Sequence, residues 1–491
     1  GVQTCALPIC LAGPAKRRLR RSHGTLVRHH RDQRIAQLLS EIAGRDREIR
    51  SARCEIQQLE SEAAAADRSR QEARQESAHE QFAKGTFAWD SQVDVSLARL
   101  GIPNFREPQR AVVNCALSRG DCFVIMPTGG GKSLCYQLPA MLIGGAEGTG
   151  ADDTEASQPL TIVISPLVSL MTDQVEQMKQ AGMAAEQITS STSKDEQRRI
   201  YSEVAGPPSG RSFRLLYVTP ERVVQSGRFK GVLQKCGSRI DCFVIDEAHC
   251  IAKCGHDFRR DYEQLHILRS SFPYVPIMAL TATAAGPVEE EVKASLLIPR
   301  AFVFRTCFNR ANLFYSYRQK PSSQEEQLIA VADFVRGLPK LQHLGSGGAG
   351  AGASGSSSAS QLPSGIVYTY SQKDAEDVSK GLSCHHAIPS VHCHAGMSPE
   401  DRQQAQALWS SGQVPVICCT VAFGMGIDKP DIRYVFHTNL PSSMEAYYQE
   451  IGRAGRDGAP ADVSLIYGLD DIRMRRRFID EDGAEQAHKF R

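Results

Sequence analysis

The sequence predicts an α/β protein in which a helical N-terminal segment precedes two units with mostly parallel sheets. From about residue 87 onward, short apolar runs alternate with stretches of helical periodicity. A glycine-rich loop, Met126–Ser133, joins one apolar run to a helical stretch. A seven-residue repeat without proline precedes both units, within residues 31–80.

The N-terminal segment carries no chemistry of its own. Residues 1–30 are expected to be a disordered basic tail, and the run Lys16–Arg21 is either a nuclear-import or nucleic-acid patch or a solvated tail. In residues 31–80, isoleucine at every seventh position predicts a heptad seam and favours a parallel coiled-coil dimer; a single helix lying on the protein body is the alternative. Residues 31–66 are therefore a candidate site for a homo-oligomer or a partner protein.

Composition limits the class of protein. The chain has 491 residues, 41% of them hydrophobic, which is enough for two or three globular domains. A net charge of +2 means that any nucleic-acid surface must come from local patches. Fifteen irregularly spaced cysteines, many in apolar runs, indicate buried thiols in a reducing compartment. No apolar run approaches 18 residues, so no membrane contact is expected, and the N-terminal charge order argues against a secretory signal.

The two α/β units are expected at 87–300 and 301–470. A polar insertion at 144–158 interrupts the first unit, and a Gly/Ser/Ala-rich insertion at 343–365 interrupts the second. Residues 471–491 are expected to begin a truncated C-terminal region. Apolar runs predict strands at 121–127, 160–166, 214–220, 242–247 and 276–283 in the first unit, and at 313–317, 365–370, 414–420, 432–437 and 462–467 in the second.

The loop Met126–Ser133 has the chemistry of a polyphosphate site. Glycines let successive backbone N–H groups converge on anionic oxygens, and the following helix N-terminus adds partial positive charge. Lys132 would reach the outer phosphates, and the Ser133 hydroxyl would ligate Mg²⁺. Met126 stands where the strict pattern has glycine, which weakens the match when the loop is considered alone.

Two further patterns complete such a site. The run Cys242–Ile245 delivers Asp246 and Glu247 to a strand end, where Asp246 would hold Mg²⁺ and Glu247 would deprotonate an attacking water. Far downstream, Arg453 and Arg456 are flanked by glycines at a predicted helix end. An arginine supplied from a second lobe stabilises transition-state charge in phosphate hydrolases, and Arg456 is the first choice for that role.

From Phe87 to Asp470 the chain resembles the RecQ helicases of helicase superfamily 2. The resemblance rests on the arginine segment and on seven further pieces in the family's order: FREPQ (Phe105–Gln109), MPTGGGKSLCYQLPA (Met126–Ala140), SPLVSLMTDQV (Ser165–Val175), YVTPER (Tyr217–Arg222), DEAHC (Asp246–Cys250), ALTATA (Ala279–Ala284) and AFGMGIDKPDIR (Ala422–Arg433). It implies two RecA-like lobes with an ATP cleft and makes Met126 a family trait. The helical upstream region is most similar to that of the short eukaryotic members.

The resemblance implies roles that spacing does not supply. ATP and Mg²⁺ are the implied ligands, and single-stranded and forked DNA the implied partner. Arg106 and Gln109 would read the adenine, and Asp428 would lie near the ribose. The expected nucleotide-binding residues are then Arg106, Gln109, Thr128, Gly129, Gly130, Gly131, Lys132, Ser133 and Asp428. The expected DNA-contact and coupling residues are Ser165, Thr219, Phe258, Arg259, Thr281, Thr283 and Thr420.

The chain also departs from the family pattern. Cys254 stands at the position of a tryptophan that senses single-stranded DNA in the family, leaving Phe258 and Arg259 for that task. No cysteine follows Cys419, so we expect the family's zinc subdomain and winged-helix domain to be absent and no zinc to be bound. The His/Cys clusters at 249–256 and 384–394 lack a zinc-finger spacing and are not expected to be metal sites.

The resemblance implies a 3′–5′ ATP-dependent DNA helicase or translocase of DNA repair and recombination, located in the nucleus or in a bacterial-type cytoplasm. Three alternatives stay open at this point. The first is a translocating ATPase that does not unwind DNA, the second is an RNA helicase, and the third is a coiled-coil interaction protein with vestigial lobes.

Overall fold

The computed structural model describes residues 69–71, 73–142, 159–206, 213–252, 259–282, 286–307, 309–341, 362–420 and 429–477, with scattered positions between 34 and 62. The chain divides into two units, residues 1–76 and 77–491. In the first unit the described positions are helical, and the side chains of Ile56 and Leu59 are 56% and 59% exposed. The seam residues Ile35, Ile42 and Ile49 lie outside the described residues, so the coiled coil stays a prediction.

Residues 77–491 contain two sheets, and every strand pairing described in them is parallel. The first has the strand order β3-β4-β2-β5-β6-β1-β7. Its strands are β1 (Cys122–Ile125), β2 (Leu160–Ile164), β3 (Ala185–Ile188), β4 (Leu215–Val218), β5 (Ile240–Ile245), β6 (Ile277–Thr281) and β7 (Phe302–Arg305). Its helices are α2 (Asp90–Arg99), α3 (Gln109–Leu117), α4 (Leu134–Leu142), α5 (Val168–Gln180), α6 (Lys194–Ala205), α7 (Pro220–Gln225), α8 (Gly227–Cys236), α9 (Arg260–Glu263), α10 (His266–Ser271) and α11 (Gly286–Ser295).

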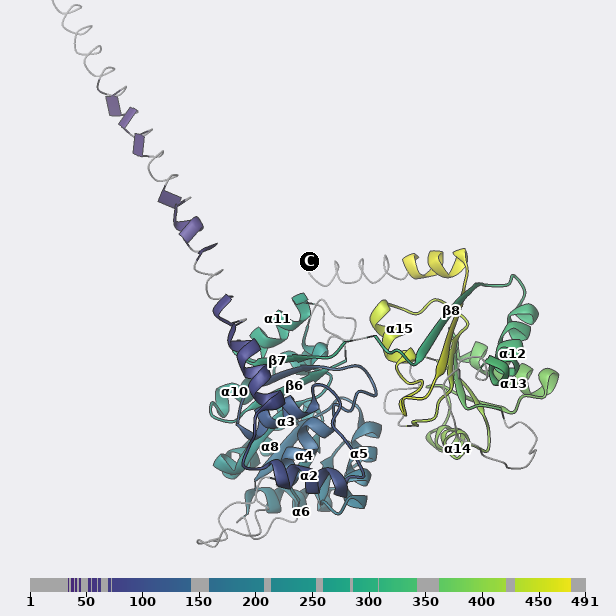
Figure 1. The fold of residues 1–491 in the computed structure, drawn as a ribbon, viewed down its shortest axis with the longest axis horizontal. Coiled ribbons are helices and arrows are strands. Elements are labelled where there is room, and N and C mark those ends of the chain that lie inside the picture. The colour runs from purple at the N-terminus through teal and green to yellow at the C-terminus, as the bar shows by residue number, and fades with distance from the viewer. Residues whose placement is uncertain are drawn as a thin grey trace, which may run out of the picture. The chain divides into compact units, whose positions relative to one another are not determined.

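The second sheet has the order β10-β11-β9-β12-β13-β8. Its strands are β8 (Leu313–Gln319), β9 (Gly365–Tyr368), β10 (Ser390–Cys393), β11 (Val416–Cys419), β12 (Tyr434–His437) and β13 (Ala461–Tyr467). Its helices are α12 (Gln324–Leu341), α13 (Gln372–His386), α14 (Pro399–Ser410) and α15 (Met444–Ile451), of which α12 packs on α13 (Figure 1). The predicted α/β class with two parallel sheets is confirmed.

Both sheets are covered on both faces, which explains why their central strands are mostly apolar. Successive strand residues alternate between two separate cores: Phe123 and Ile125 belong to one, and Cys122 and Val124 to the other. The second sheet repeats this, with Tyr368 in one core and Val367 in the other. A continuous apolar run is the expected sequence of a strand buried on both sides.

Three strands were not predicted, and all three lie at sheet edges. β3 and β7 are the two outer strands of the first sheet, and β10 is an outer strand of the second. Each has partly exposed residues: β3 and β10 mix apolar with polar residues, and the apolar part of β7 is the short run Phe302–Phe304, which ends at Arg305. β7 also corrects the predicted boundary at residue 300, because it pairs with β1 and so belongs to the first sheet.

The predicted start of the first α/β unit, residue 87, is also too late. Residues 73–84 are helical, and Phe82, only 8% exposed, lies in the core of the first lobe with Phe304. The Asn114 amide donates to the Phe82 carbonyl at 2.8 Å and accepts from Trp89 Nε1 at 2.9 Å. The lobe therefore begins before residue 87, and Ala78, inside the predicted stretch 31–80, packs against the same core. Among the described residues, no helix is long and apolar enough to cross a bilayer.

Candidate nucleotide site

The loop between β1 and α4 has a backbone that needs glycine. Gly129 and Gly131 have φ values of +75° and +84°, in the left-handed region that other residues adopt with strain. The Gly130 N–H donates to the Pro127 carbonyl at 2.9 Å, closing the first turn. The Lys132 ammonium donates to the Met126 carbonyl at 3.2 Å. A lysine whose ammonium group is bound to its own loop can exchange this carbonyl for the oxygens of a bound phosphate.

Gln109 braces this loop. Its side-chain Nε2 donates to the carbonyls of Gly130 and Gly131 at 3.3 and 3.0 Å, and its Oε1 accepts from the Arg106 N–H at 2.7 Å. The Arg106 guanidinium donates to the Gly129 carbonyl at 2.8 Å. Gln109 is 3% exposed and does not line the cavity described below. Its predicted task, reading the adenine, therefore stays a prediction, whereas its contact with the loop is direct.

Asp246 and Glu247 follow β5 at the carboxyl edge of the first sheet, as the sequence predicts. Asp246 is 8% exposed; its carboxylate accepts from the Glu247 N–H at 3.0 Å and from the Ser165 hydroxyl at 3.4 Å. Burial, and next the Glu247 charge, raise the pKa of Asp246 to about 7, against an opposing effect of Lys132. A bound cation would favour the ionised carboxylate, so the site suits a divalent metal.

Tyr262, which the sequence did not single out, and His249, which it considered only as part of a metal-like cluster, contact these two acidic residues. The Tyr262 hydroxyl donates to the Asp246 carbonyl at 2.9 Å. His249 Nδ1 lies 3.3 Å from Glu247 Oε2 and 3.0 Å from the Thr281 hydroxyl. A chain of contacts thus joins Glu247 to the end of β6, where Thr281 is fully buried. The adjacency of His249 to Asp246 and Glu247 in the sequence was the available signal.

The arginine segment is fastened by the second lobe. The Arg310 guanidinium donates to the Gly452 and Gly455 carbonyls at 3.0 and 2.5 Å. Arg453 is 6% exposed, and its Nε donates to the Tyr368 hydroxyl at 2.8 Å. Neither Arg310 nor Tyr368 was predicted, because each is distant in sequence from the motif that it supports.

The turn that carries Arg456 lies against the phosphate loop. The Arg106 guanidinium donates to the Arg456 carbonyl at 3.4 Å. A Cβ added to Gly129 would lie 2.8 Å from Arg456 Cγ, and one added to Gly452 would lie 3.0 Å from Thr128 Cβ. The close approach of the Arg456 side chain to Gly129, and of the Thr128 side chain to Gly452, is a second reason for glycine at both positions.

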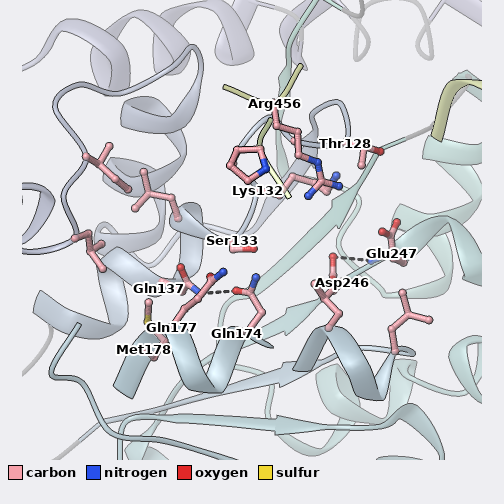
Figure 2. A pocket seen from close by; sticks show the side chains of 18 of the residues that line it. Thr128, Lys132, Ser133, Gln137, Gln174, Gln177, Met178, Asp246, Glu247 and Arg456 are labelled. Atoms are coloured by element: carbon pink, nitrogen blue, oxygen red, sulfur yellow. Dashed lines mark hydrogen bonds between the residues drawn. The ribbon is translucent and has the colours of Figure 1, made fainter. Parts of the chain in front are cut away.

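These elements enclose a cavity of about 770 Å³. Figure 2 shows Thr128, Lys132 and Arg456 at the top of the cavity, Asp246 and Glu247 below them on the right, and Ser133 below Lys132. The predicted residues that line it are Arg106, Thr128, Gly129, Gly131, Lys132, Ser133, Asp246, Glu247, Arg259, Arg453 and Arg456. It extends to a polar group on α4 and α5, where Gln137 Nε2 donates to Gln174 Oε1 at 2.5 Å.

The predicted DNA-contact residues are more dispersed. Thr219 immediately precedes α7, and Thr420 follows β11, so both lie at carboxyl ends of strands but not in the cavity. Ser165 directs its hydroxyl to Asp246. Asp428, Phe258, Thr283 and Cys254 lie outside the described residues, so their roles stay predictions.

Comparisons with known proteins match residues 106–292 to the DEAD/DEAH box helicase family and residues 358–458 to the helicase conserved C-terminal domain. The chain is 40% identical over 392 residues to the ATP-dependent DNA helicase Q1 of Mus musculus, covering 79% of this chain and 55% of the mouse protein. It is 40% identical over 390 residues to the ATP-dependent DNA helicase Q-like 2 of Arabidopsis thaliana, covering 79% of this chain and 50% of that protein. The chain thus spans about half the length of these relatives.

Two solved structures share the fold. S. cerevisiae Dbp5 bound to RNA and ADP BeF3 has a TM-score of 0.57 at 17% identity, covering 79% of this chain and 91% of that chain. The DUF1998 helicase MrfA bound to DNA and AMPPNP has a TM-score of 0.58 at 16% identity, covering 79% and 52% respectively. At these identities the likeness concerns the fold alone.

Proposed function

Because the chain belongs to the RecQ family of superfamily 2 helicases, we propose that it is an ATP-dependent 3′–5′ DNA helicase of DNA repair and recombination. The observation that carries the proposal is the cavity that Lys132 and Glu247 share with Arg456. A phosphate-binding lysine, a carboxylate base and an arginine are the three charges that hydrolysis of a γ-phosphate needs.

ATP is the proposed substrate and Mg²⁺ the proposed metal. Ser133 and Asp246 would hold the ion, which neutralises charge on the β- and γ-phosphates. The buried Asp246 carboxyl supports this assignment, because its pKa is raised to about 7 and an adjacent cation would offset that cost. Glu247 would accept the proton of the attacking water. Lys132, Arg453 and Arg456 would stabilise negative charge on the transferred phosphoryl group.

The proposal also includes a route from ATP to DNA. Contacts from Glu247 to His249 and from His249 to Thr281 join the hydrolytic carboxylate to the end of β6. A nucleotide that displaces Glu247 would change the partner of His249 and so the position of Thr281. Thr219 and Thr420, at strand ends of the two lobes, would contact the phosphates of one DNA strand without reading its bases.

The direct test measures ATP hydrolysis with and without single-stranded DNA. The purified chain is expected to show DNA-stimulated hydrolysis, and Lys132→Ala is expected to lose it. Lys235→Ala, an exposed lysine on α8 that does not line the cavity, is the matched control and should retain it. Absence of stimulation in the unmodified chain, or its persistence in Lys132→Ala, would contradict the proposal.

Two rival activities are separated by the nucleic acid used. Matched DNA and RNA oligonucleotides competing for stimulation distinguish a DNA from an RNA helicase, and the proposal requires DNA to win. A strand-displacement assay on a forked duplex, run beside the ATPase assay, distinguishes unwinding from translocation alone.

We further propose a nuclear location, and a partner protein or second copy bound through residues 31–66. Removing residues 1–76 tests the second point, because residues 77–491 form a separate unit. Loss of partner binding or of dimers with retained hydrolysis is expected. Unchanged sedimentation mass and unchanged partner binding in the shortened chain would contradict a role of residues 31–66. If the intact chain binds a partner through these residues but hydrolyses no ATP, the alternative of an interaction protein with vestigial lobes is favoured.

A further inference from the structure

A cluster of three side chains of the kinds that can ligate a metal lies in the second lobe, outside the nucleotide cavity. Glu376 is in the first turns of α13, His392 is in β10, and His394 follows β10 by one residue. One ligand atom from each lies within 4.8 Å of the other two. The sequence spacing did not predict this group, because Glu376 comes from a preceding helix.

The two histidine side chains lie close to each other and to Glu376. Residues two apart along an extended chain point to the same side, and the His392 and His394 rings are nearly parallel, 15° apart, with centroids 5.6 Å apart. His394 Nε2 lies 3.0 Å from Glu376 Oε1. Ligand atoms about 2.0–2.2 Å from a tetrahedral Zn²⁺ are about 3.3–3.5 Å from one another. The Glu376–His394 pair is already close to this spacing, and His392 needs a small side-chain rotation.

The three residues differ in their exposure to solvent, and this difference leaves a route by which an ion can reach them. His394 is 5% exposed, and its Nδ1 is buried with no hydrogen-bond partner among the described residues. Glu376 is 53% exposed, and His392 is partly exposed. The protein thus fixes one ligand in its interior while the other two face solvent, where an ion can enter.

We propose that Glu376, His392 and His394 bind one divalent transition-metal ion, with Zn²⁺ preferred. Two imidazoles and one carboxylate suit zinc, whereas Mg²⁺ and Ca²⁺ favour oxygen ligands. Three protein ligands leave a fourth position for water. The ion ties the start of α13 to the end of β10, and this departs from our expectation that the 384–394 histidines hold no metal.

The site lies at the sheet edge of the second lobe that also carries a predicted DNA-contact residue. β10 pairs with β11 in parallel register, Cys393 opposite Cys419, so His394 and Thr420 follow paired positions at the same sheet edge. Thr420 is one of the predicted DNA-contact residues. The ion therefore adds a positive charge beside the edge where a phosphate backbone is proposed to run.

Metal titration of the full chain tests the proposal independently of ATP hydrolysis. Protein stripped by a chelator is titrated with Zn²⁺ against a chromophoric competitor, with Mg²⁺ present throughout to occupy oxygen sites. The unmodified chain is expected to bind one more equivalent than His392→Ala, or to bind that equivalent at least about tenfold more tightly. His385→Ala, an exposed histidine at the far end of α13, is the matched control and should bind as the unmodified chain does.

Co²⁺ substitution supplies a second readout. The difference spectrum between the unmodified chain and His392→Ala should show d–d bands without thiolate charge transfer, because no cysteine is among the ligands. Glu376→Gln, on an exposed side chain, should reproduce the loss of affinity and serves if His392→Ala does not fold. Equal binding in all variants, equal loss in His385→Ala, or a thiolate spectrum would overturn the proposal and leave Glu376–His394 as a hydrogen bond only.

Discussion

Arg453 Nε donates to the Tyr368 hydroxyl at 2.8 Å, deep in the second lobe. The Tyr368 ring stacks on His437, with centroids 5.1 Å apart, and His437 Nε2 lies 2.7 Å from Glu450 Oε2. The orientation of Arg453 is thus set by side chains of β9, β12 and α15 together. Burial raises the pKa of Tyr368 far above its usual range, so the phenol stays protonated and neutral beside the guanidinium.

Tyr368→Phe is expected to destabilise the protein by about 1–3 kcal/mol, the usual cost when a buried polar group loses its partner. The turnover number for ATP should fall several-fold because Arg453 loses its orientation, while KM changes less. Chemical unfolding and steady-state ATPase assays measure the two effects. Tyr434→Phe is the control: Tyr434 is equally buried, and its hydroxyl has no hydrogen-bond partner among the described residues. Equal losses in both variants would contradict a specific role for the Tyr368 hydroxyl.

Gly131→Ala is expected to lower ATP turnover by about tenfold or more, since displacements of about 1 Å in a catalytic site cost up to about 100-fold. The added Cβ would lie 2.4 Å from Gln109 Nε2, and the φ of +84° adds strain. Gly412→Ala separates the two causes, because Gly412 has a φ of +77° and open space around it. It should lose stability through backbone strain but keep its turnover; a similar loss of turnover there would show that loop sterics are not the cause.

The stability of the ligand-free protein is expected to fall as pH rises from about 4 to about 7. The pKa of Asp246 is raised to about 7 in the folded state, by burial first and by Glu247 second, from an ordinary value of 3.8. In that window the folded chain holds a proton that the unfolded chain has released, so the free energy of unfolding decreases with pH. Asp246→Asn should flatten this part of the profile. Urea unfolding of both proteins in chelator, over this pH range, measures the difference, and parallel profiles would contradict it.

Phe82→Ala is expected to cost about 3–5 kcal/mol, as for other buried phenylalanines. Phe82 is 8% exposed and packs edge-on against Phe302, with centroids 5.4 Å apart. Leu59→Ala is the control from the helical positions of residues 1–76, since Leu59 is 59% exposed. The midpoint of thermal unfolding should drop in the first variant only. A small effect in Phe82→Ala would mean that the first lobe does not need the helical segment 73–84.

Sequence patterns were sufficient to predict the strands that are completely buried. Strands such as β1 and β11 are covered on both faces, so their residues are apolar without interruption and are visible in the sequence. Outer strands β3, β7 and β10 have partly exposed residues. β3 and β10 are mixed in composition, and β7 is a short apolar run that ends at Arg305, so none gave a clear strand pattern. Only the pairing of β7 with β1 decided where the first sheet ends.

The sequence by itself determined the candidate chemistry: a glycine loop with Lys132, paired carboxylates at 246 and 247, and glycine-flanked arginines. These are local patterns, in which the functional residues are neighbours along the chain. The tertiary structure decided what holds them, because Gln109, Tyr368 and Arg310 reach their partners across long sequence separations. It also brought Glu376 to His394, since a parallel sheet places a helix start beside the strand that follows that helix. No sequence spacing encodes such contacts, which arise only when the sheet has formed.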